Sequence, residues 1–471
     1  MYGRSSNIRL KLPLAGCFFN AFALILCILT AGPLAWAARF CRKKDGLRFP
    51  GKWVCWIAPM AAERIVIENY KGIKKLDLEV RPFTVLIGPQ SVGKSTTAKL
   101  LYFFKNMARE AGMAATADTE TSLEAHLIER FWKFMPPPTR KGGKSVIRYS
   151  VGDAVFSLTS AGNGDSNWRI ELPKIFRDEL ASMKKECSEI SKTTNTKTWG
   201  FRFVAQHRFL ASLKRKLGPQ FSHAPQFIPA GRSFYAHLEK DPVSFYESAT
   251  LDPFIAEFGK TLSSLKEDFF GRDPHFGDPK VLHRATELAQ QLLSGKYQRE
   301  GQRDFIITTD EQRIPAALWS SGQQESFPLV LFLYDLCRGG MSNEILFVEE
   351  PEAHLFPSSQ RHMVELLAAA FREKKGRLNL FITTHSPYVL SALNVLLLAG
   401  RLGGGKLKGG DNEGVVNPLE ALAPGSFGAY YMDQNECRLI MDPETGLIDG
   451  SGIDDVSGEI AEQFDAVSRL Q

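Results

Sequence analysis

The sequence predicts an α/β protein built around a parallel sheet. Three short apolar runs, at residues 84–87, 345–348 and 380–384, have the length and continuity of strands that are buried on both faces. The first run is followed by a loop that contains Gln90, Ser91, Lys94 and Ser95, and the other two are followed by Glu349 and His385. Because the carboxyl ends of parallel strands meet at one edge of a sheet, we expect the polar residues after these runs to form one site.

The first run, residues 84–87, leads into a glycine-rich loop and then into apolar residues at helical spacing. In a phosphate-binding loop, backbone N–H groups wrap the phosphates at a helix N-terminus, Lys94 neutralises the β- and γ-phosphate oxygens, and Ser95 offers its hydroxyl to Mg²⁺. A chance glycine-rich turn would not need the flanking strand and helix. The sequence therefore predicts ATP and Mg²⁺ as cofactors. The predicted nucleotide-binding residues are Gly88, Pro89, Gln90, Ser91, Val92, Gly93, Lys94, Ser95 and Thr96.

The second run, residues 345–348, ends in the acidic sequence Glu349-Glu350-Pro351-Glu352. At the end of a strand the first carboxylate can hold Mg²⁺ through water, and the second can orient or deprotonate the attacking water. The alternative is an ordinary acidic loop after a strand. Beside a phosphate-binding loop we expect Glu349 to serve the metal together with Ser95, and Glu350 to be the catalytic base.

The third run, residues 380–384, delivers His385 to the same edge of the sheet. A histidine in this place can reach a γ-phosphate. Considered alone, a histidine after a strand is more often an ordinary loop residue. Because it follows the other two motifs in order, we expect His385 to be catalytic.

A fourth motif, Ser320-Ser321-Gly322-Gln323, precedes an apolar helix and lies between the first two motifs in the sequence. Serine before glycine at a helix start is a good N-cap, which would explain the residues without any function. The alternative is an anion-binding site at the helix N-terminus.

In this order, the four motifs resemble those of ABC-type ATPases, in particular the SMC, RecF and OLD-like branch of AAA family ATPases. Residues 349–355 are especially similar to OLD-like proteins, and residues 65–73 resemble the first strand of the group. The resemblance covers residues 63–105 and 305–390. Transporters of the wider family carry aspartate where this chain has Glu349.

The resemblance implies the fold of an ABC-ATPase head and a shared site. Ser320, Ser321, Gly322 and Gln323 would be the signature, which closes over a γ-phosphate held by a second subunit. A head-to-tail homodimer or a higher homo-oligomer is therefore expected. Residues 228–233, Ile-Pro-Ala-Gly-Arg-Ser, look like a recurring motif of the family whose role the sequence does not reveal.

The tail, from Tyr430 to Ser457, resembles stand-alone ATPases of bacterial anti-phage systems such as PARIS. Full OLD proteins carry a nuclease with an Asp-x-Asp motif, and no such motif follows His385. We therefore expect an effector protein that acts in trans, and a role of the ATPase in sensing or regulating it. The alternative is a RecF- or SMC-like ATPase of DNA repair or maintenance that binds DNA directly.

Composition and charge bear on the choice of partner. With 44% hydrophobic and 23% charged residues, the chain is not a mostly disordered or fibrous protein. Of the net charge of +6, residues 1–59 contribute +8, so residues 60–471 carry −2. A nearly neutral body favours a protein partner over nucleic acid.

A basic cluster at residues 184–216 keeps the nucleic-acid alternative open. Aromatic residues are interleaved with the basic ones, as in surfaces that bind single strands. The same pattern also fits solvated helix faces around core aromatics. The basic residues are Lys184, Lys185, Lys192, Lys197, Arg202, Arg208, Lys214, Arg215 and Lys216.

Residues 12–38 contain no charged residue and are long enough to span a bilayer. Three interpretations compete: a signal peptide, an inner-membrane anchor that leaves the ATPase in the cytoplasm, and translation that really begins at Met60. Charge and cysteine usage change near Met60, which favours the last one. The seven cysteines show no pairing or metal-binding spacing, so a reduced, cytoplasmic location is expected.

The expected domains follow from the positions of the motifs. Residues 1–59 form a separate apolar and basic segment, and residues 60–105 and 305–471 form the two lobes of the ATPase head. Residues 106–304 are expected to be a mixed, mainly helical insertion, with β-like runs between 146 and 171. Helices are expected at 174–192, 201–217, 244–270 and 280–296.

Overall fold

A computed structural model describes most of the chain after residue 61. The described residues are 62–116, 122–135, 143–160, 168–193, 199–218, 221, 224–236, 251–268, 277–340, 344–403, 416–450, 463 and 468. The expectations for residues 1–59, including the span at 12–38 and the start at Met60, lie outside this part. Within it, no helix is long and apolar enough to cross a membrane.

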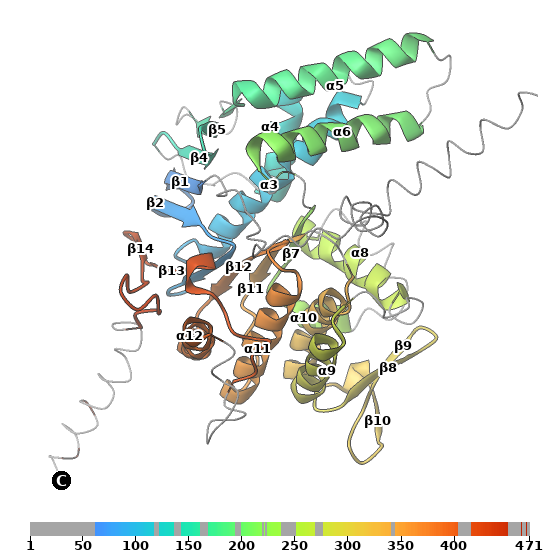
Figure 1. Cartoon of the computed structure of the whole chain (residues 1–471), viewed down its shortest axis with the longest axis vertical. Helices are drawn as coiled ribbons and strands as arrows, with labels where there is room; N and C mark the ends of the chain where they lie inside the picture. Colours follow the sequence, from blue (N-terminus) through green and yellow to red (C-terminus); the bar gives the residue numbers. More distant parts are fainter. Residues whose placement is uncertain are drawn as a thin grey trace, which may run out of the picture. The chain divides into compact units, whose positions relative to one another are not determined.

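The centre of the fold is a six-stranded sheet in the order β14-β13-β3-β12-β11-β7 (Figure 1). All of its pairings are parallel except that of β13 with β14. Every residue of β3 and β12 is buried, as expected for parallel strands covered on both faces. The strands are β3 (Phe83–Ile87), β7 (Ala224–Ile228), β11 (Glu344–Glu349), β12 (Leu378–Thr384), β13 (Phe427–Met432) and β14 (Cys437–Leu439).

The register of this sheet aligns the ends of three strands. Thr384 at the end of β12 is level with Ile87 at the end of β3, and Glu349 at the end of β11 is level with Thr383. The residues that follow β3, β11 and β12 therefore leave the sheet at the same edge. This alignment places the three predicted motifs next to one another.

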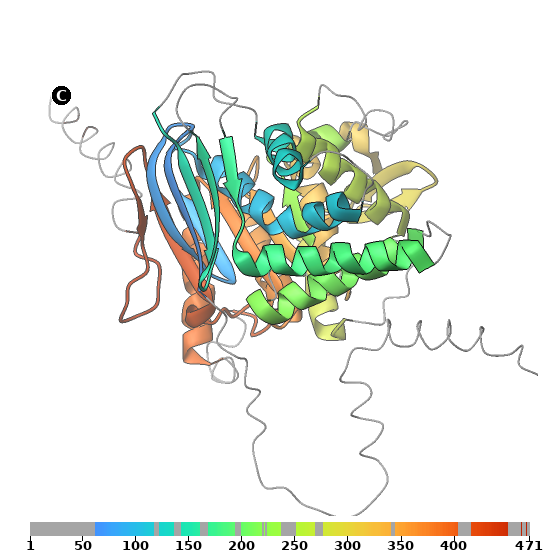
Figure 2. The same ribbon diagram turned by 90° about the horizontal axis from the view of Figure 1, so that it is seen from above.

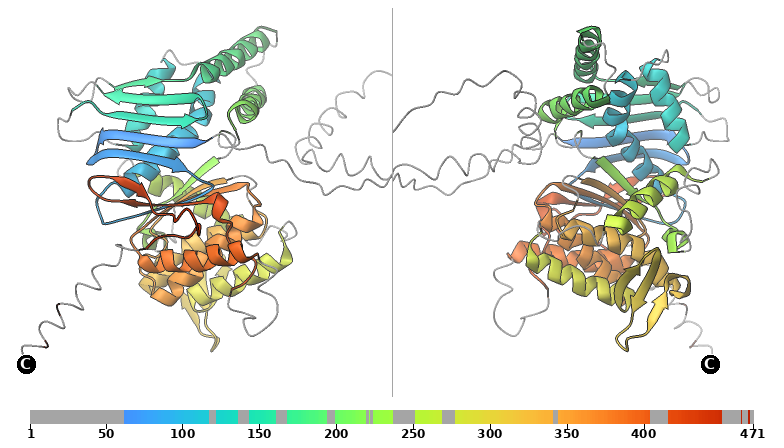
Figure 3. Two further views of the ribbon diagram at one scale, coloured as in Figure 1. Left: turned by 60° about the vertical axis from the view of Figure 1, so that its left-hand side comes forward. Right: turned by 90° about the vertical axis from the view of Figure 1, so that its right-hand side faces the viewer.

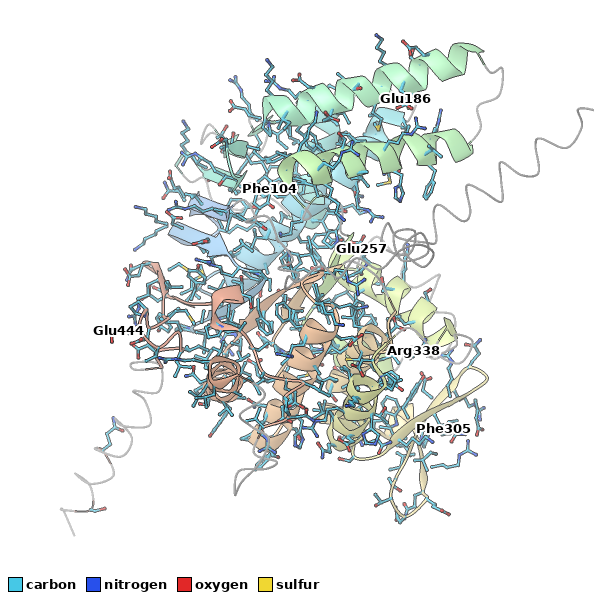
Figure 4. All side chains as sticks on the ribbon, viewed as in Figure 1. Phe104, Glu186, Glu257, Phe305, Arg338 and Glu444 are labelled. Atoms are coloured by element: carbon cyan, nitrogen blue, oxygen red, sulfur yellow. The ribbon has the colours of Figure 1, made fainter. Side chains whose placement is uncertain are left out.

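A second sheet is antiparallel and has the order β2-β1-β4-β5-β6. Figure 3 shows it above the core sheet, with α3 behind it. Phe104 of α3, labelled in Figure 4, is fully buried and stacks on Tyr149 of β4 with the ring centroids 5.3 Å apart. The strands are β1 (Glu63–Tyr70), β2 (Ile73–Val80), β4 (Val146–Val151), β5 (Ala154–Ser160) and β6 (Trp168–Glu171).

Two groups of helices cover the sheets. In the first group, α5 and α6 lie side by side and both contact α3 (Figures 1 and 2). This group contains α3 (Lys94–Thr116), α4 (Leu123–Phe134), α5 (Lys174–Thr193) and α6 (Trp199–Leu217). In the second group, α10 contacts α8, α9 and α11. This group contains α8 (Pro253–Asp268), α9 (Pro279–Leu293), α10 (Ser321–Cys337), α11 (Pro357–Glu373) and α12 (Pro387–Leu402).

The remaining elements of the described residues are short. A small antiparallel sheet in the order β10-β9-β8 follows α9 in the sequence. Its strands are β8 (Lys296–Glu300), β9 (Arg303–Ile307) and β10 (Arg313–Pro315). Three 3-10 helices are η3 (Arg232–Ala236), η4 (Ala316–Leu318) and η5 (Pro424–Ser426).

The α/β prediction is confirmed, and the structure adds a feature that the sequence did not indicate. Residues 106–304, expected as an insertion, contribute strands to both large sheets: β4 pairs with β1, and β7 pairs with β11. The helical elements of this range are mixed with these strands. Pairing between distant segments, whether antiparallel as for β1 and β4 or parallel as for β7 and β11, leaves no local pattern in the sequence, so a strand's partner cannot be read from its residues.

Candidate functional site

The loop between β3 and α3 turns tightly against the neighbouring strand. A Cβ atom at Gly88 would lie 1.9 Å from the carbonyl oxygen of Met432, so only glycine fits at this approach. Gly93 has φ +110°, and a Cβ atom there would lie 2.5 Å from Ile73 Cγ1. Ser91 also has a positive φ, 62°. These residues form a compact loop that leads directly into the N-terminus of α3.

Lys94, the first residue of α3, is only 5% exposed. Its Nζ donates to the carbonyl oxygens of Gly88, at 2.7 Å, and Pro89, at 2.5 Å. Burial lowers the pKa of Lys94 to about 8, and the charges of Glu350 and Glu352 act in the opposite direction. An ammonium group at the start of a helix is a point charge of the kind that pairs with phosphate.

His385 connects Lys94 to the acidic strand. Its Nδ1 lies 3.3 Å from Lys94 Nζ, and its Nε2 lies 3.2 Å from Glu350 Oε1. An ammonium group can only donate, so Nδ1 accepts from Lys94, and the ring proton on Nε2 points to the carboxylate of Glu350. The three predicted residues thus form one chain of contacts across β3, β12 and β11.

Glu350 follows β11 in a left-handed backbone conformation with φ 43°. Its backbone N–H donates to Thr383 O at 2.8 Å, which ties it to the neighbouring strand. The side chain is 37% exposed and contacts the imidazole ring of His385. A non-glycine residue with positive φ is held there by its surroundings, and such residues concentrate at functional sites.

The two other carboxylates of the motif are engaged differently. Glu349 Oε2 accepts from the backbone N–H of Ala230 at 3.2 Å. Glu352 Oε1 accepts from Thr384 Oγ1 at 2.7 Å and from the backbone N–H of His385 at 2.8 Å. Glu349 and Glu352 are buried, whereas the side chain of Glu350 is 37% exposed, and Glu352 binds the backbone N–H of His385.

The site suits a magnesium ion brought in with the nucleotide. Glu349 Oε1 is buried and has no hydrogen-bond partner within the described part of the chain, and the same holds for Thr383 Oγ1. Burying a carboxylate oxygen without a partner is costly, and a cation or its water would satisfy it. Ser95 is exposed at the start of α3 and can offer its hydroxyl. Glu349 and Ser95 would hold the ion, which would draw charge from the phosphate oxygens.

The Ser320–Gln323 motif begins α10, as predicted for its helix. Ser320 is the N-cap, its side chain accepts from Gln323 N, and Gln323 Oε1 accepts from Ser320 N in a capping box. Gln323 Nε2 also donates to Leu293 O at 2.7 Å. The side chains of Ser320 and Gln323 are thus occupied within the chain. Ser321 is exposed and Gly322 is half-buried in the first turn.

Sequence reasoning missed two residues beside this site. Arg232, in the motif without an assigned role, donates to the carbonyl oxygens of Glu349 and Glu350, and it pairs with Glu325 of α10. Both residues stood in recognisable places in the sequence: Arg232 lies within the Ile228–Ser233 motif, and Glu325 is an acidic residue near the start of an apolar helix. Only the fold shows that the two meet.

The fold and the site define a P-loop ATPase with the α/β head expected from the sequence. The chain matches the AAA ATPase domain family over residues 60–198 and 248–390, more than half of its length, and it belongs to this family. No curated protein sequence matches it.

Several solved structures show a distant likeness. An SMC head bound to the C-terminal winged-helix domain of ScpA has 11% identity, a TM-score of 0.39, and coverage of 82% of this chain and 98% of its own. The SMC head domain from Thermotoga maritima has 11% identity, a TM-score of 0.31, and coverage of 71% and 92%. A dimeric ATP-binding cassette bound to ADP and Pi has 10% identity, a TM-score of 0.29, and coverage of 81% and 99%. Likeness at this level does not define a function.

The two contacts of His385 can be separated by substitution. Asparagine keeps an acceptor near the place of Nδ1, whereas glutamine keeps a donor near the place of Nε2. If the proton that His385 offers to Glu350 matters for hydrolysis, His385→Asn should lower kcat by about 10- to 100-fold and His385→Gln should retain more activity. Steady-state ATPase assays give kcat, and a parallel titration checks that both variants still bind ATP. This role would be contradicted if the two variants had equal kcat values, or if both had the kcat of the wild type.

Proposed function

We propose that this protein binds ATP with Mg²⁺ and hydrolyses it at a site shared between two copies of the chain arranged head to tail. The observation that carries the proposal is the chain of contacts from Lys94 through His385 to Glu350. It joins a phosphate-binding lysine to a carboxylate that can act on water. Hydrolysis needs both functions beside the γ-phosphate.

In the proposed reaction, residues of one chain bind and orient the nucleotide. Backbone N–H groups of Gly88–Lys94 and the Lys94 ammonium hold the phosphates, and Ser95 and Glu349 hold Mg²⁺. Glu350 takes a proton from the attacking water, and His385 contacts the γ-phosphate and keeps Glu350 in place. Electrostatic positioning of this kind supplies most of the catalysis in phosphoryl transfer.

The second chain supplies Ser321 and Gly322. The N-terminus of α10 leaves N–H groups that point outward and favour an anion. Helix α10 makes its main contacts with α8, α9, α11 and η3, whereas α3 makes its main contacts with α4, α5, α6 and the strands. Helices α10 and α3 thus pack mainly against different elements. This arrangement is compatible with a contact between the N-terminus of α10 and the phosphate of another subunit.

Mixing two inactive variants tests the shared site. Lys94→Ala removes the phosphate lysine, and Ser321→Arg places a long side chain at an exposed position that does not serve as the N-cap. In an equal mixture, about half of the dimers are mixed, and each has one intact site of two, so about a quarter of the wild-type rate should return. ATPase assays of the separate variants and of the mixture give the answer.

Ser182→Arg, at an exposed serine of α5, is the matched control for the new arginine and should leave activity unchanged. Two results would refute the shared site. One is a mixture that stays inactive although mixed dimers are shown to form. The other is full-rate hydrolysis by a chain proven to be monomeric.

For the biological role, we propose that ATP-driven dimerisation senses infection and regulates an effector protein in bacterial anti-phage defence. The resemblance of the tail to stand-alone defence ATPases and the slightly acidic body support a protein partner. Plating of phage on cells that express the chain with its gene neighbours tests this role. Protection that requires Lys94 would support it, and unaltered plating with the wild-type chain would contradict it.

The alternative function, a DNA-repair or DNA-maintenance ATPase, rests on the exposed face of α6. Phe203 is 52% exposed and lies near His207, and Lys214 and Arg215 are exposed on the same helix. Against it, Arg208 and Lys216 are ion-paired with Glu186 and Glu179 of α5. Figure 4 labels Glu186 on α5, beside α6. Salt-dependent binding of single-stranded or duplex DNA that is lost in Lys214→Glu/Arg215→Glu would favour this alternative.

A further inference from the structure

Arg232 is the largest fully buried side chain of the described residues, and its guanidinium donates to four backbone carbonyl groups. Nη1 donates to Glu349 O at 2.6 Å and to Pro229 O at 3.1 Å. Nη2 donates to Glu350 O at 2.8 Å, and Nε donates to Glu325 O at 3.0 Å. Burial lowers the pKa of Arg232, and Glu325 is the nearest charge that opposes this effect.

Glu325 closes the arrangement from the side of α10. It is 1% exposed, and its two oxygens accept from the backbone N–H groups of Arg232 and Ser233, both at 2.8 Å. Its Oε1 also lies 3.5 Å from Arg232 Nη2. Glu325 follows Ser321 by four residues, which is about one helical turn. A buried ion pair therefore links the first turns of α10 to the turn after β7.

The same guanidinium reaches the end of β11. Glu350 has a left-handed backbone, and hydrogen bonds hold the peptide groups on both sides of its Cα. Its N–H donates to Thr383 O, and its carbonyl oxygen accepts from Arg232 Nη2. A guanidinium offers five donors in a rigid plane and can hold two adjacent carbonyl groups together with a third element. A lysine at this position could not make the same set of contacts.

We propose that Arg232 is a positioning residue for ATP hydrolysis. It holds the peptide of Glu350 in the conformation that presents the carboxylate to water, and it ties that peptide to α10. Engagement of Ser321 and Gly322 with the nucleotide of a second subunit is thereby transmitted to the base of the same chain. The transmission rests on the proposed shared site, whereas the positioning of Glu350 does not.

A purely structural ion pair is the competing explanation, because an unpaired buried charge destabilises a fold strongly. The test uses Arg232→Lys, Arg232→Met, and the double variant Arg232→Met/Glu325→Gln, which removes both charges at similar volume. Arg169→Lys, at an exposed arginine of β6, is the control. For each full-length chain, kcat, the Kd for a non-hydrolysable ATP analogue and the denaturation midpoint are measured.

If Arg232 positions Glu350, kcat of Arg232→Lys falls at least about tenfold while Kd changes less than about threefold. The double variant should regain the stability lost in Arg232→Met, and its kcat should stay low because the carbonyl groups of Glu349 and Glu350 still lack their donor. Recovery of wild-type kcat together with stability in the double variant would overturn the proposal.

The transmission is tested in mixed dimers of Lys94→Ala and Ser321→Arg chains. In the active site of such a dimer, the Ser321→Arg chain supplies the P-loop and Glu350, and the other chain supplies the signature. Because transmission runs from α10 to Glu350 within one chain, and α10 of the Ser321→Arg chain is blocked, transmission predicts a restored rate that is measurable but below the quarter expected for independent sites. Arg232→Lys should lower this rate further in the Ser321→Arg chain and leave it unchanged in the Lys94→Ala chain. A restored rate of a full quarter would refute transmission and keep the positioning role. If the unsubstituted mixture restores nothing, the shared site fails, and the variants of the preceding test still decide the role of Arg232.

Discussion

Lys94→Ala is expected to lower the affinity for ATP by at least about 100-fold, equivalent to about 2.7 kcal/mol. The ammonium group of Lys94 lies within the loop and donates to the carbonyl oxygens of Gly88 and Pro89. Alanine leaves the backbone N–H groups of the loop in place and removes only this charge. Titration of a fluorescent ATP analogue measures the affinity.

The fold should survive this substitution, because Lys94 lies at the start of α3 and alanine is a good helix former. Lys75→Ala, at an exposed lysine of β2, is the matched control and should bind as the wild type does. Unchanged affinity of Lys94→Ala, with a circular dichroism spectrum like that of the wild type, would remove the basis of the nucleotide site.

Glu350→Gln is expected to lower kcat by about 10²- to 10⁴-fold and to leave ATP binding nearly unchanged. Glutamine keeps the shape of the side chain and still accepts from His385, but it cannot take a proton from water. Because hydrolysis would no longer release the subunits, ATP should trap the closed oligomer. Single-turnover assays and size-exclusion chromatography with ATP measure the two effects.

The assignment of Glu350 as the base rests on the engagement of its neighbours. Glu352→Gln should not match its effect, because one oxygen of Glu352 already binds Thr384 and the N–H of His385, and the amide oxygen of glutamine can keep these contacts. A wild-type rate for Glu350→Gln would exclude Glu350 as the base and leave Glu349 or Glu352, and a larger loss for Glu352→Gln would favour Glu352.

The sequence predicted the parts of the site that follow buried strands. β3, β11 and β12 were recognisable because strands covered on both faces are continuously apolar, and their parallel arrangement implied that Lys94, Glu350 and His385 meet. A serine N-cap was also expected before α10, but at the serine that precedes the glycine, Ser321, whereas the structure has the N-cap at Ser320.

Other contacts could not be predicted because they join residues that are distant in the sequence. Arg232 and Glu349 are 117 positions apart, and each residue alone has an ordinary local context. The pairing of β1 with β4 has the same origin, since an alternating pattern shows which face of a strand is buried and does not reveal its partner. The different contacts of Glu349, Glu350 and Glu352 could be distinguished only from their hydrogen bonds in the structure.

The order of strands in the core sheet has a consequence for how the protein is made. β3 carries the nucleotide loop and is among the first strands to be synthesised, yet both of its neighbours, β12 and β13, begin only at Leu378 and Phe427. A growing chain of about 370 residues therefore contains the whole loop and no partner for its strand. The apolar run of β3 stays unpaired on the ribosome until nearly the last part of the head emerges. Such distant pairing slows folding and exposes segments prone to aggregation, so newly made chains should depend on chaperones for longer than their size alone implies.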